Sequence, residues 1–310
     1  MSAKILPGTA DNVSAAATVL RQGGLVAMPT ETVYGVAANA AHNAAVARIY
    51  AAKGRPQFNP LIAHVSSMEM ALREGIFHAN AKRLAETLWP GPITLVVDVA
   101  ATGSVSELAR AGLESIALRM PRHPIARQLI EAFGGPLVAP SANPSGKISP
   151  TLPEHVSADL GDKVDLILDG GPCAAGGEST IVDARGDRPA LLRPGSLDPA
   201  EIENIWPGLI RPKLNPDAPQ SPGQLLRHYA PEAKLRLNAD APSAGEAYLG
   251  FGPIEATLNL SNESDLTEAA ANLFAMLRDL DARFDRIAVA PIPTNGLGEA
   301  INDRLTRAAK

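Results

Sequence analysis

Apolar residues recur every three to four positions in several parts of the chain, which is the spacing of one face of an α-helix. In the first of these parts Val13, Ala17 and Leu20 fall on one stripe, and two glycines follow it. Glycine is common just after a helix, so the pattern predicts a helix that ends there. The same reasoning, with an asparagine as the candidate N-cap of the second helix, predicts helices over residues 13–22, 43–53, 80–89 and 123–133.

Short apolar runs lie between and after these helices, bounded by proline, glycine and asparagine, and are typical of buried strands. In the run PLIAHV, Leu61, Ala63 and Val65 share one face, so His64 lies on the other face with Ile62. Helices and strands do not alternate strictly, which predicts a mixed α/β sheet with flanking helices. The predicted strands cover residues 25–30, 60–65, 93–99, 115–121, 136–143, 164–171, 179–184 and 190–195.

The composition changes after residue 206. Residues 207–231 are rich in proline, which interrupts helices and strands, and they predict a linker. This linker also contains Arg227, His228 and Tyr229, which a plain spacer does not require. Beyond it, β-, α-, β- and α-like segments predict a small unit with a parallel sheet. The predicted organisation is a larger domain over residues 1–206, a linker or lid over 207–231 and a smaller Rossmann-like α/β domain over 232–310.

Composition and charge exclude several classes of protein. The chain has 310 residues, 45% of them hydrophobic, which is enough for one large or two ordinary domains. A net charge of -5 does not favour nucleic acid or anionic membranes as partners. Cys173 is the only cysteine, which excludes an intramolecular disulfide and a multi-cysteine zinc site. No apolar run has the length of a membrane span and no secretory signal is present, so we expect a cytoplasmic protein.

Lys53, Arg55, Asn59 and His64 follow one another closely at the end of the second predicted helix. Cations at a helix C-terminus often only interact with the helix dipole. Here Gly54 and two flanking prolines restrict the backbone, so the side chains are oriented in advance. We expect this cluster to contact a ligand.

Arg119 stands at the end of the apolar strand SIALRMP, where an uncompensated charge would be costly. Two explanations are open. The arginine pairs with a carboxylate from a neighbouring strand, or its planar donors bind a carboxylate or phosphate of a substrate.

The segment APSANPSGKISP carries hydroxyl and amide side chains at Ser141, Asn143 and Ser149. Such residues form anion-binding turns, although they are also ordinary turn formers. The segment is not a P-loop, because Ile148 stands where that motif needs Ser or Thr and Ser141 stands where its first glycine belongs.

Ser179 precedes one predicted strand and Arg193 ends another. With Lys53, Arg55 and Arg119 they give separated cationic segments and a few hydroxyls, which suit a polyanion together with a small polar molecule. The sequence has no cluster of His, Asp or Cys at metal-ligand spacing and no nucleophile elbow, so we predict no protein metal site.

Several segments occur in a fixed order along the chain, namely PTETVYG, KGRPQFNPLIAHV, WPGPITLV, ALRMPRHP, APSANPSGKISP, ESTIVD and LLRPGS. Together they resemble the YrdC-domain threonylcarbamoyl-AMP synthases. The later segments SPGQLLRHYAP and GLGEAINDRLTRAA resemble the longer, two-domain form of that family. The resemblance covers nearly the whole chain and is weakest over residues 235–285. It departs from the family after SPG, where Gln224 and Leu225 replace the usual Met and aromatic residue.

The resemblance implies a concave basic cleft and a nucleotidyltransferase that converts L-threonine, bicarbonate and ATP to threonylcarbamoyl-AMP and pyrophosphate. It implies that ATP is a substrate, with Mg²⁺ held mainly by the triphosphate. The product would pass to a threonylcarbamoyl-transferase complex that modifies tRNA next to the anticodon, with no tRNA contact required of this chain.

The resemblance also assigns roles to residues. L-Threonine would lie among Thr32, His64, Arg119, Ala139 and Ser179, with Arg119 taking its carboxylate. Lys53 and Arg55 would serve the developing charge of the reaction as catalytic residues. ATP would contact Arg55, Asn59, Ser115, Ser141, Asn143, Ser149, Arg193, His228 and Tyr229.

Two alternatives remain. An RNA-binding module with a basic concave face would also use these cations, but the acidic balance and an aromatic content of 4% argue against it. A carbamoyl-transfer maturation protein that carries the same domain would need cysteine-pair zinc segments, which a single cysteine excludes.

Overall fold

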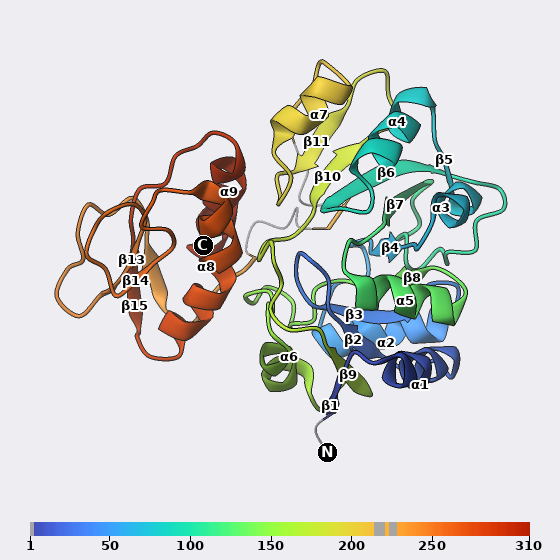
Figure 1. Cartoon of the computed structure of the whole chain (residues 1–310), viewed down its shortest axis with the longest axis horizontal. Coiled ribbons are helices and arrows are strands. Elements are labelled where there is room, and N and C mark those ends of the chain that lie inside the picture. Colours follow the sequence, from blue (N-terminus) through green and yellow to red (C-terminus); the bar gives the residue numbers. More distant parts are fainter. Residues whose placement is uncertain (1–2, 214–220, 223–227) are drawn as a thin grey trace.

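The computed structural model describes residues 3–213, 221–222 and 228–310 (Figure 1). Most helices lie close to their predicted positions. The helices of the larger part are α1 (Ala10–Arg21), α2 (Asn43–Lys53), α3 (Met68–Glu74), α4 (Ala79–Leu88), α5 (Pro124–Phe133), α6 (Pro153–Leu160) and α7 (Pro199–Ile205).

The larger part is built on one long mixed sheet, which confirms the predicted fold class. Its strands are β1 (Lys4–Pro7), β2 (Val26–Met28), β3 (Gly35–Asn39), β4 (Ile62–His64), β5 (Gly75–Ile76), β6 (Ile93–Val99), β7 (Ser115–Arg119), β8 (Leu137–Val138), β9 (Leu166–Asp169), β10 (Thr180–Asp183) and β11 (Ala190–Arg193). Their order is β1-β9-β2-β3-β8-β4-β7-β6-β10-β11, with β5 paired to β6.

Some helix ends differ from the prediction for local reasons. Helix α1 begins three residues early, because the side chain of Thr9 caps it by accepting a hydrogen bond from the amide of Asn12. The predicted asparagine cap of α2 is wrong, since His42 is the N-cap and makes no side-chain capping bond. The predicted end of α2 is confirmed, and Gly54 closes it in the left-handed conformation with φ of 60°.

Short elements were not predicted. Helices α3, α6 and α7 have only seven or eight residues, too few for a clear helical period. Strand β3 has the sequence GVAAN, whose glycine and alanines give no strand signal. These elements are fixed by the sheet and the core rather than by local pattern.

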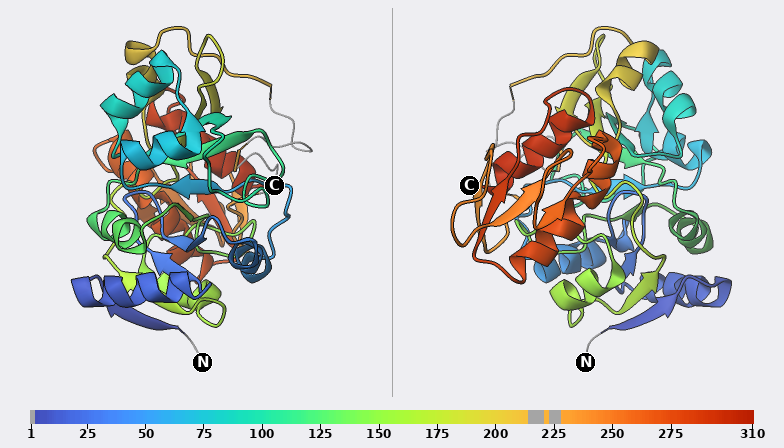
Figure 2. Two further views of the ribbon diagram at one scale, coloured as in Figure 1. Left: turned by 90° about the vertical axis from the view of Figure 1, so that its right-hand side faces the viewer. Right: turned by 60° about the vertical axis from the view of Figure 1, so that its left-hand side comes forward.

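The C-terminal part forms a second, smaller sheet of parallel strands, as predicted. Figure 1 shows the two C-terminal helices between this sheet and the larger part, and Figure 2 shows the C-terminal unit lying across one side of that part. The ion pair between Arg278 and Asp159, at 2.6 Å, joins the two parts. The elements are β12 (Lys234–Arg236), β13 (Ala247–Gly250), β14 (Leu258–Asn259), β15 (Arg286–Val289), α8 (Leu266–Asp281) and α9 (Leu297–Ala308), in the sheet order β12-β15-β13-β14.

The boundaries at residues 206 and 231 stay predictions, because the segment between them is only partly described. Gln224, Leu225 and Arg227 of the predicted linker lie outside the described residues. In the described part of the chain, no helix has both the length and the apolar character that crossing a membrane requires.

Candidate active site

The register of the sheet brings the first site residues together. Strand β4 pairs in parallel with β7, and this register sets His64 directly beside Arg119. On the other side of β4, the amide of Ala139 donates a hydrogen bond to the carbonyl oxygen of Ile62 at 3.1 Å. Two strand ends and the loop after β8 therefore meet at one place.

A cleft of about 490 Å³ opens at this place and continues toward β10 and β11. Segments far apart in the sequence line it, and Arg55, Arg119 and Arg193 all contribute. The predicted convergence of three arginines on one pocket is therefore observed, while the ligand of each remains a prediction. The lining residues are Thr32, Val33, Arg55, Ile62, His64, Arg119, Ala139, Pro140, Ser141, Glu178, Ser179, Arg193, Pro222 and His228.

Arg119 has a carboxylate partner. Its Nη2 donates to Oε1 of Glu31 at 2.7 Å, and both side chains are buried. Burial opposes ionisation of Glu31, but the charge and hydrogen bonds of Arg119 outweigh it and lower the pKa of this carboxyl. Glu31 lies in the loop after β2, so the carboxylate comes from a loop and not from a neighbouring strand. Nε of Arg119 is buried and has no hydrogen-bond partner among the described residues.

Arg55 and Arg193 lack such a partner among the described residues. Nη2 of Arg55 donates to the carbonyl of Pro60 at 3.0 Å. Arg193 donates from Nε and Nη2 to the carbonyl of Ser179, at 3.1 and 2.9 Å, and from Nη2 to its hydroxyl. Burial lowers the pKa of Arg55 to about 10 and also lowers that of Arg193, so both remain cations near neutral pH. Their charge is oriented by neutral oxygens and is not cancelled.

Lys53 lies behind the lining of the cleft. Its Nζ donates to the carbonyls of Ser141, at 2.5 Å, and Asn143. Burial, and then the nearby charge of Arg55, lowers the pKa of Lys53 well below its ordinary value. In this position Lys53 holds the loop after β8 in place.

Three other predicted ligand contacts also lie behind the lining. Asn143 donates from its side chain to the carbonyls of Pro144 and Lys147. Ser149 donates its hydroxyl to Oε1 of Glu178 at 2.5 Å. Asn59 is fully buried, and neither polar atom of its amide has a partner. An unpaired buried amide costs roughly 1–3 kcal/mol unless a ligand satisfies it.

Tyr229 and Ser115 do not line the cleft. The ring of Tyr229 is wholly buried in the C-terminal core, 5.4 Å from that of Phe274. Its neighbour His228 does line the cleft, and burial together with the charge of Arg55 lowers the pKa of this imidazole well below the ordinary value. Ser115 begins β7, four residues before Arg119, and lies on the same face of that strand.

His64 is neutral at physiological pH. Burial, then the charge of Arg119, lowers its pKa to about 3. A hydrogen bond of 3.2 Å joins Nδ1 to the carbonyl of Ile62, so Nδ1 carries the proton and Nε2 is an acceptor.

Sequence reasoning missed three charged residues at or beside the cleft. Glu31 stands between two threonines in PTETVYG, and Glu178 precedes the noted Ser179. Arg304 lies in the last helix and reaches Glu178 across the domain interface. The two glutamates could have been found by asking which carboxylates lie near the cationic segments, but no local signal marks Arg304.

The described residues hold no group of three or more His, Cys, Asp or Glu that could bind a metal ion. Glu178 is the acidic residue of the described lining, and Ser149 and Arg304 already contact its carboxylate.

Comparison with known proteins identifies the family. A family model described as telomere recombination matches residues 18–195, and one described as threonylcarbamoyl-AMP synthase, C-terminal domain, matches residues 197–310. The threonylcarbamoyl-AMP synthase of Bacillus subtilis is 38% identical, with 96% of this chain and 92% of that protein covered.

A solved structure agrees over both parts. The crystal structure of Sua5 from Pyrococcus abyssi, complexed with L-threonine, is 39% identical, has a TM-score of 0.89 and covers 97% of this chain and 95% of its own. The threonylcarbamoyl-AMP synthase of the same organism is 39% identical, with 95% and 93% coverage. The prediction of an enzyme of this kind is confirmed, and this chain belongs to the threonylcarbamoyl-AMP synthase family.

Proposed function

We propose that the cleft makes threonylcarbamoyl-AMP from L-threonine, bicarbonate and ATP. The amine of threonine combines with bicarbonate and loses water to give a carbamate. A carbamate oxygen then attacks the α-phosphorus of ATP, and pyrophosphate leaves. The observation that carries this proposal is the meeting of Arg55, Arg119 and Arg193 with a neutral imidazole in one cleft. These steps require alignment and charge neutralisation more than a protein nucleophile.

The end of the cleft at His64 and Arg119 would bind threonine. Nη2 of Arg119 is held by Glu31, and its unpartnered Nε remains for the threonine carboxylate. Nε2 of His64 would accept a hydrogen bond from the amine or hydroxyl of threonine, since it carries a lone pair. Thr32, Ala139 and Ser179 complete this end of the lining.

The end at Arg55 and Arg193 would bind the triphosphate. Two buried cations that have no carboxylate partner in the described part of the chain suit a polyanion. The unpaired amide of Asn59 lies beside Arg55, whose Nε donates to the carbonyl of Asn59 at 3.4 Å. Because this amide lies behind the lining, we expect Asn59 to act on ATP through Arg55.

Adenosine would lie along the apolar face of the sheet. Ile62 lines the cleft and packs with Val96, Ala117, Ile181 and Leu192. Because side chains alternate along β7, Ser115 lies on the face of Ala117 and is placed to contact the nucleoside. Ser141 lines the cleft, while Ser149 and Asn143 would act through the loop that holds them.

Lys53 would fix the loop after β8, which borders the cleft, by donating to the carbonyls of Ser141 and Asn143. We expect Lys53 to act on the developing carbamate and phosphate charge through the position of this loop. Mg²⁺ would enter with ATP and be held by phosphate oxygens, because the described residues offer no cage for it.

The product is an activated acyl-adenylate, so the enzyme that consumes it would be a threonylcarbamoyl transferase acting on tRNA. Transfer in a separate complex leaves this chain without a required tRNA contact, and we place the reaction in the cytoplasm. His228, which lines the cleft, would cover the nucleotide from the linker side, while Tyr229 would support it from the C-terminal core.

Mass analysis of the product tests the proposal. The protein is incubated with ATP, L-threonine and ¹³C-bicarbonate, and an adenylate that carries both threonine and the label is expected, together with pyrophosphate. Formation of this adenylate only when all three substrates are present supports the function. RNA binding without any labelled adenylate would favour the RNA-binding alternative.

A further inference from the structure

An acidic residue lies inside a cleft that we expect to bind polyanions. Glu178 is the only acid among the lining residues of the described part of the chain, and it is buried. An uncompensated carboxylate there would repel phosphate groups across a medium that screens poorly. The charge of Glu178 therefore needs a partner.

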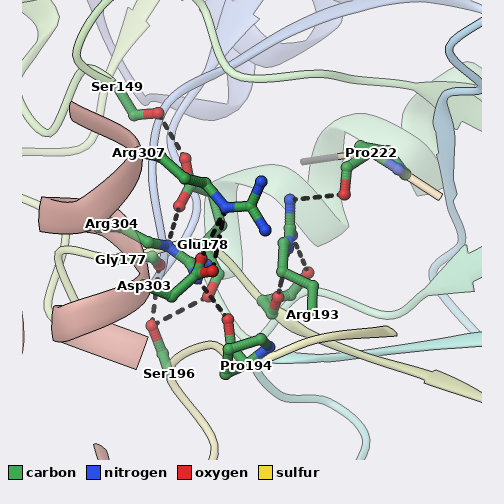
Figure 3. Close-up of polar contacts among 11 residues, drawn as sticks. Ser149, Gly177, Glu178, Arg193, Pro194, Ser196, Pro222, Asp303, Arg304 and Arg307 are labelled. Atoms are coloured by element: carbon green, nitrogen blue, oxygen red, sulfur yellow. Dashed lines mark hydrogen bonds and ion pairs between the residues drawn. The ribbon is translucent and has the colours of Figure 1, made fainter. Parts of the chain in front are cut away.

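The partner comes from the other domain. Arg304 of α9 approaches Oε2 of Glu178 with its Nε at 3.2 Å, while Oε1 accepts the hydroxyl of Ser149 (Figure 3). The side chains of Glu178 and Arg304 are 7% and 3% exposed, so water screens this pair only weakly.

Arg304 contacts two further segments beside the cleft. Its Nη1 donates to the carbonyl of Pro194 at 2.6 Å, directly after Arg193 in the chain. Its guanidinium lies 5.3 Å from the centre of the Tyr229 ring, next to His228. Arg304 thus contacts one lining residue, Glu178, and the chain neighbours of two others, Arg193 and His228.

The backbone around this contact is closely packed. A Cβ atom added at Gly176, two residues before Glu178, would lie 2.0 Å from the carbonyl oxygen of Ala271 in α8. Asp303 also accepts a hydrogen bond from Nη1 of Arg304, at 3.0 Å. Arg304 is therefore held from both sides of the interface.

We propose that Arg304 is a positioning residue through which the C-terminal domain completes the ATP end of the cleft. It cancels the charge of Glu178, so that Arg55 and Arg193 keep theirs for the triphosphate, and it fixes the segments that carry Ser149 and Arg193. This inference rests on the proposed function.

A double-mutant cycle on the full-length chain tests it. The probe is α,β-methylene ATP, which cannot lose pyrophosphate, and its dissociation constant is measured by calorimetry. Arg304→Met should weaken binding by about tenfold or more, because it leaves Glu178 charged and unpaired. Glu178→Gln combined with Arg304→Met removes both charges, and it should recover most of that loss.

The conservative variant separates charge from shape. Arg304→Lys keeps the positive charge and should bind the probe within about threefold of the wild type, and it remains informative if Arg304→Met does not fold. Arg211→Met is the matched control. Arg211 pairs with Glu299 of α9, the helix that carries Arg304, but Arg211 is exposed and lies outside the cleft lining. It should leave probe binding unchanged.

Turnover shows whether the effect is confined to ATP. In Arg304→Met the KM for ATP should rise while kcat at saturating ATP stays within about threefold of the wild type. A double variant that binds as weakly as Arg304→Met, or a lysine variant as weak as the methionine one, would overturn the inference.

Wild-type turnover is measured first, so that the two proposals are tested separately. Failure of the wild type to make threonylcarbamoyl-AMP would refute the proposed function. Product formation by the wild type without recovery in the double variant would refute the inference alone.

Discussion

The two ends of the cleft differ in how their positive charges are balanced. Arg119 pairs with Glu31 at 2.7 Å, whereas Arg55 and Arg193 contact carbonyl and hydroxyl oxygens and no carboxylate among the described residues. A balanced end suits an amino acid whose own charges cancel. An unbalanced end suits a triphosphate. Our assignment of a ligand to each arginine therefore depends on its protein partners and not on its burial alone.

We expect the largest effect from a substitution at the threonine end of the cleft, the end at His64 and Arg119. Arg119→Ala should lower kcat/KM for threonine by roughly 100-fold, about 3 kcal/mol, since the carboxylate of bound threonine loses its charge-assisted hydrogen bond. Steady-state kinetics with threonine varied at saturating ATP measure it.

The matched control is Arg127→Ala, which removes an arginine from a half-exposed pair on α5. It should behave like the wild type. An unchanged threonine dependence in Arg119→Ala would count against the assignment of this end.

We expect the next largest effect at the ATP end of the cleft, the end at Arg55 and Arg193. Arg193→Met should weaken ATP binding by about 2–3 kcal/mol, the typical contribution of a hydrogen-bonded charge. Threonine binding should weaken less, because Arg193 reaches the threonine end only through its hydrogen bonds to Ser179. Calorimetric titration with each ligand separately measures the two effects. Equal losses for both ligands would show that the ends of the cleft are not distinct.

The pH dependence of stability also distinguishes the two ends, because His64 lies at the threonine end beside Arg119. Its folded pKa of about 3 lies below the ordinary value of 6.5, so the unfolded chain binds a proton that the folded protein refuses. Stability is therefore complete above pH 6.5 and declines toward pH 3, by about 1.4 kcal/mol per pH unit from this group.

Between pH 7 and pH 5, His64→Gln should lose about 2 kcal/mol less stability than the wild type. Denaturant unfolding at the two pH values measures this difference. His42→Gln removes an exposed imidazole and controls for the loss of one histidine. Equal pH dependence of the wild type and His64→Gln would contradict a neutral His64 in the folded protein.

We expect the smallest effect at Ser115, which begins β7 and lies on the same face of the sheet as Ala117. Ser115→Ala should weaken ATP binding by about 1 kcal/mol, the net contribution of one neutral hydrogen bond, and leave threonine binding unchanged. Titration with α,β-methylene ATP measures it. Wild-type affinity in this variant would remove Ser115 from the nucleotide site.

Local pattern was sufficient wherever the periodicity of a strand or helix positions the residue. Alternation in PLIAHV placed His64 opposite Leu61 and Val65, and His64 indeed lines the cleft. The glycine after α2 was predicted because a left-handed residue there is a local requirement.

Pairing across the fold could not be predicted in this way. Glu31 meets Arg119 from 88 positions away, and Arg304 meets Glu178 from 126 positions away. No periodicity links such residues, since only the packed sheet and the docked C-terminal helices bring them together. Tyr229 was misplaced for a related reason, because its burial beside Phe274 depends on the C-terminal core.

A structure of the protein with α,β-methylene ATP and L-threonine tests the central distinction most directly. We expect the threonine carboxylate at Arg119 and the phosphates at Arg55 and Arg193, with the base along Ile62 and Ala117. Phosphate groups bound at Arg119, or threonine bound between Arg55 and Arg193, would contradict it.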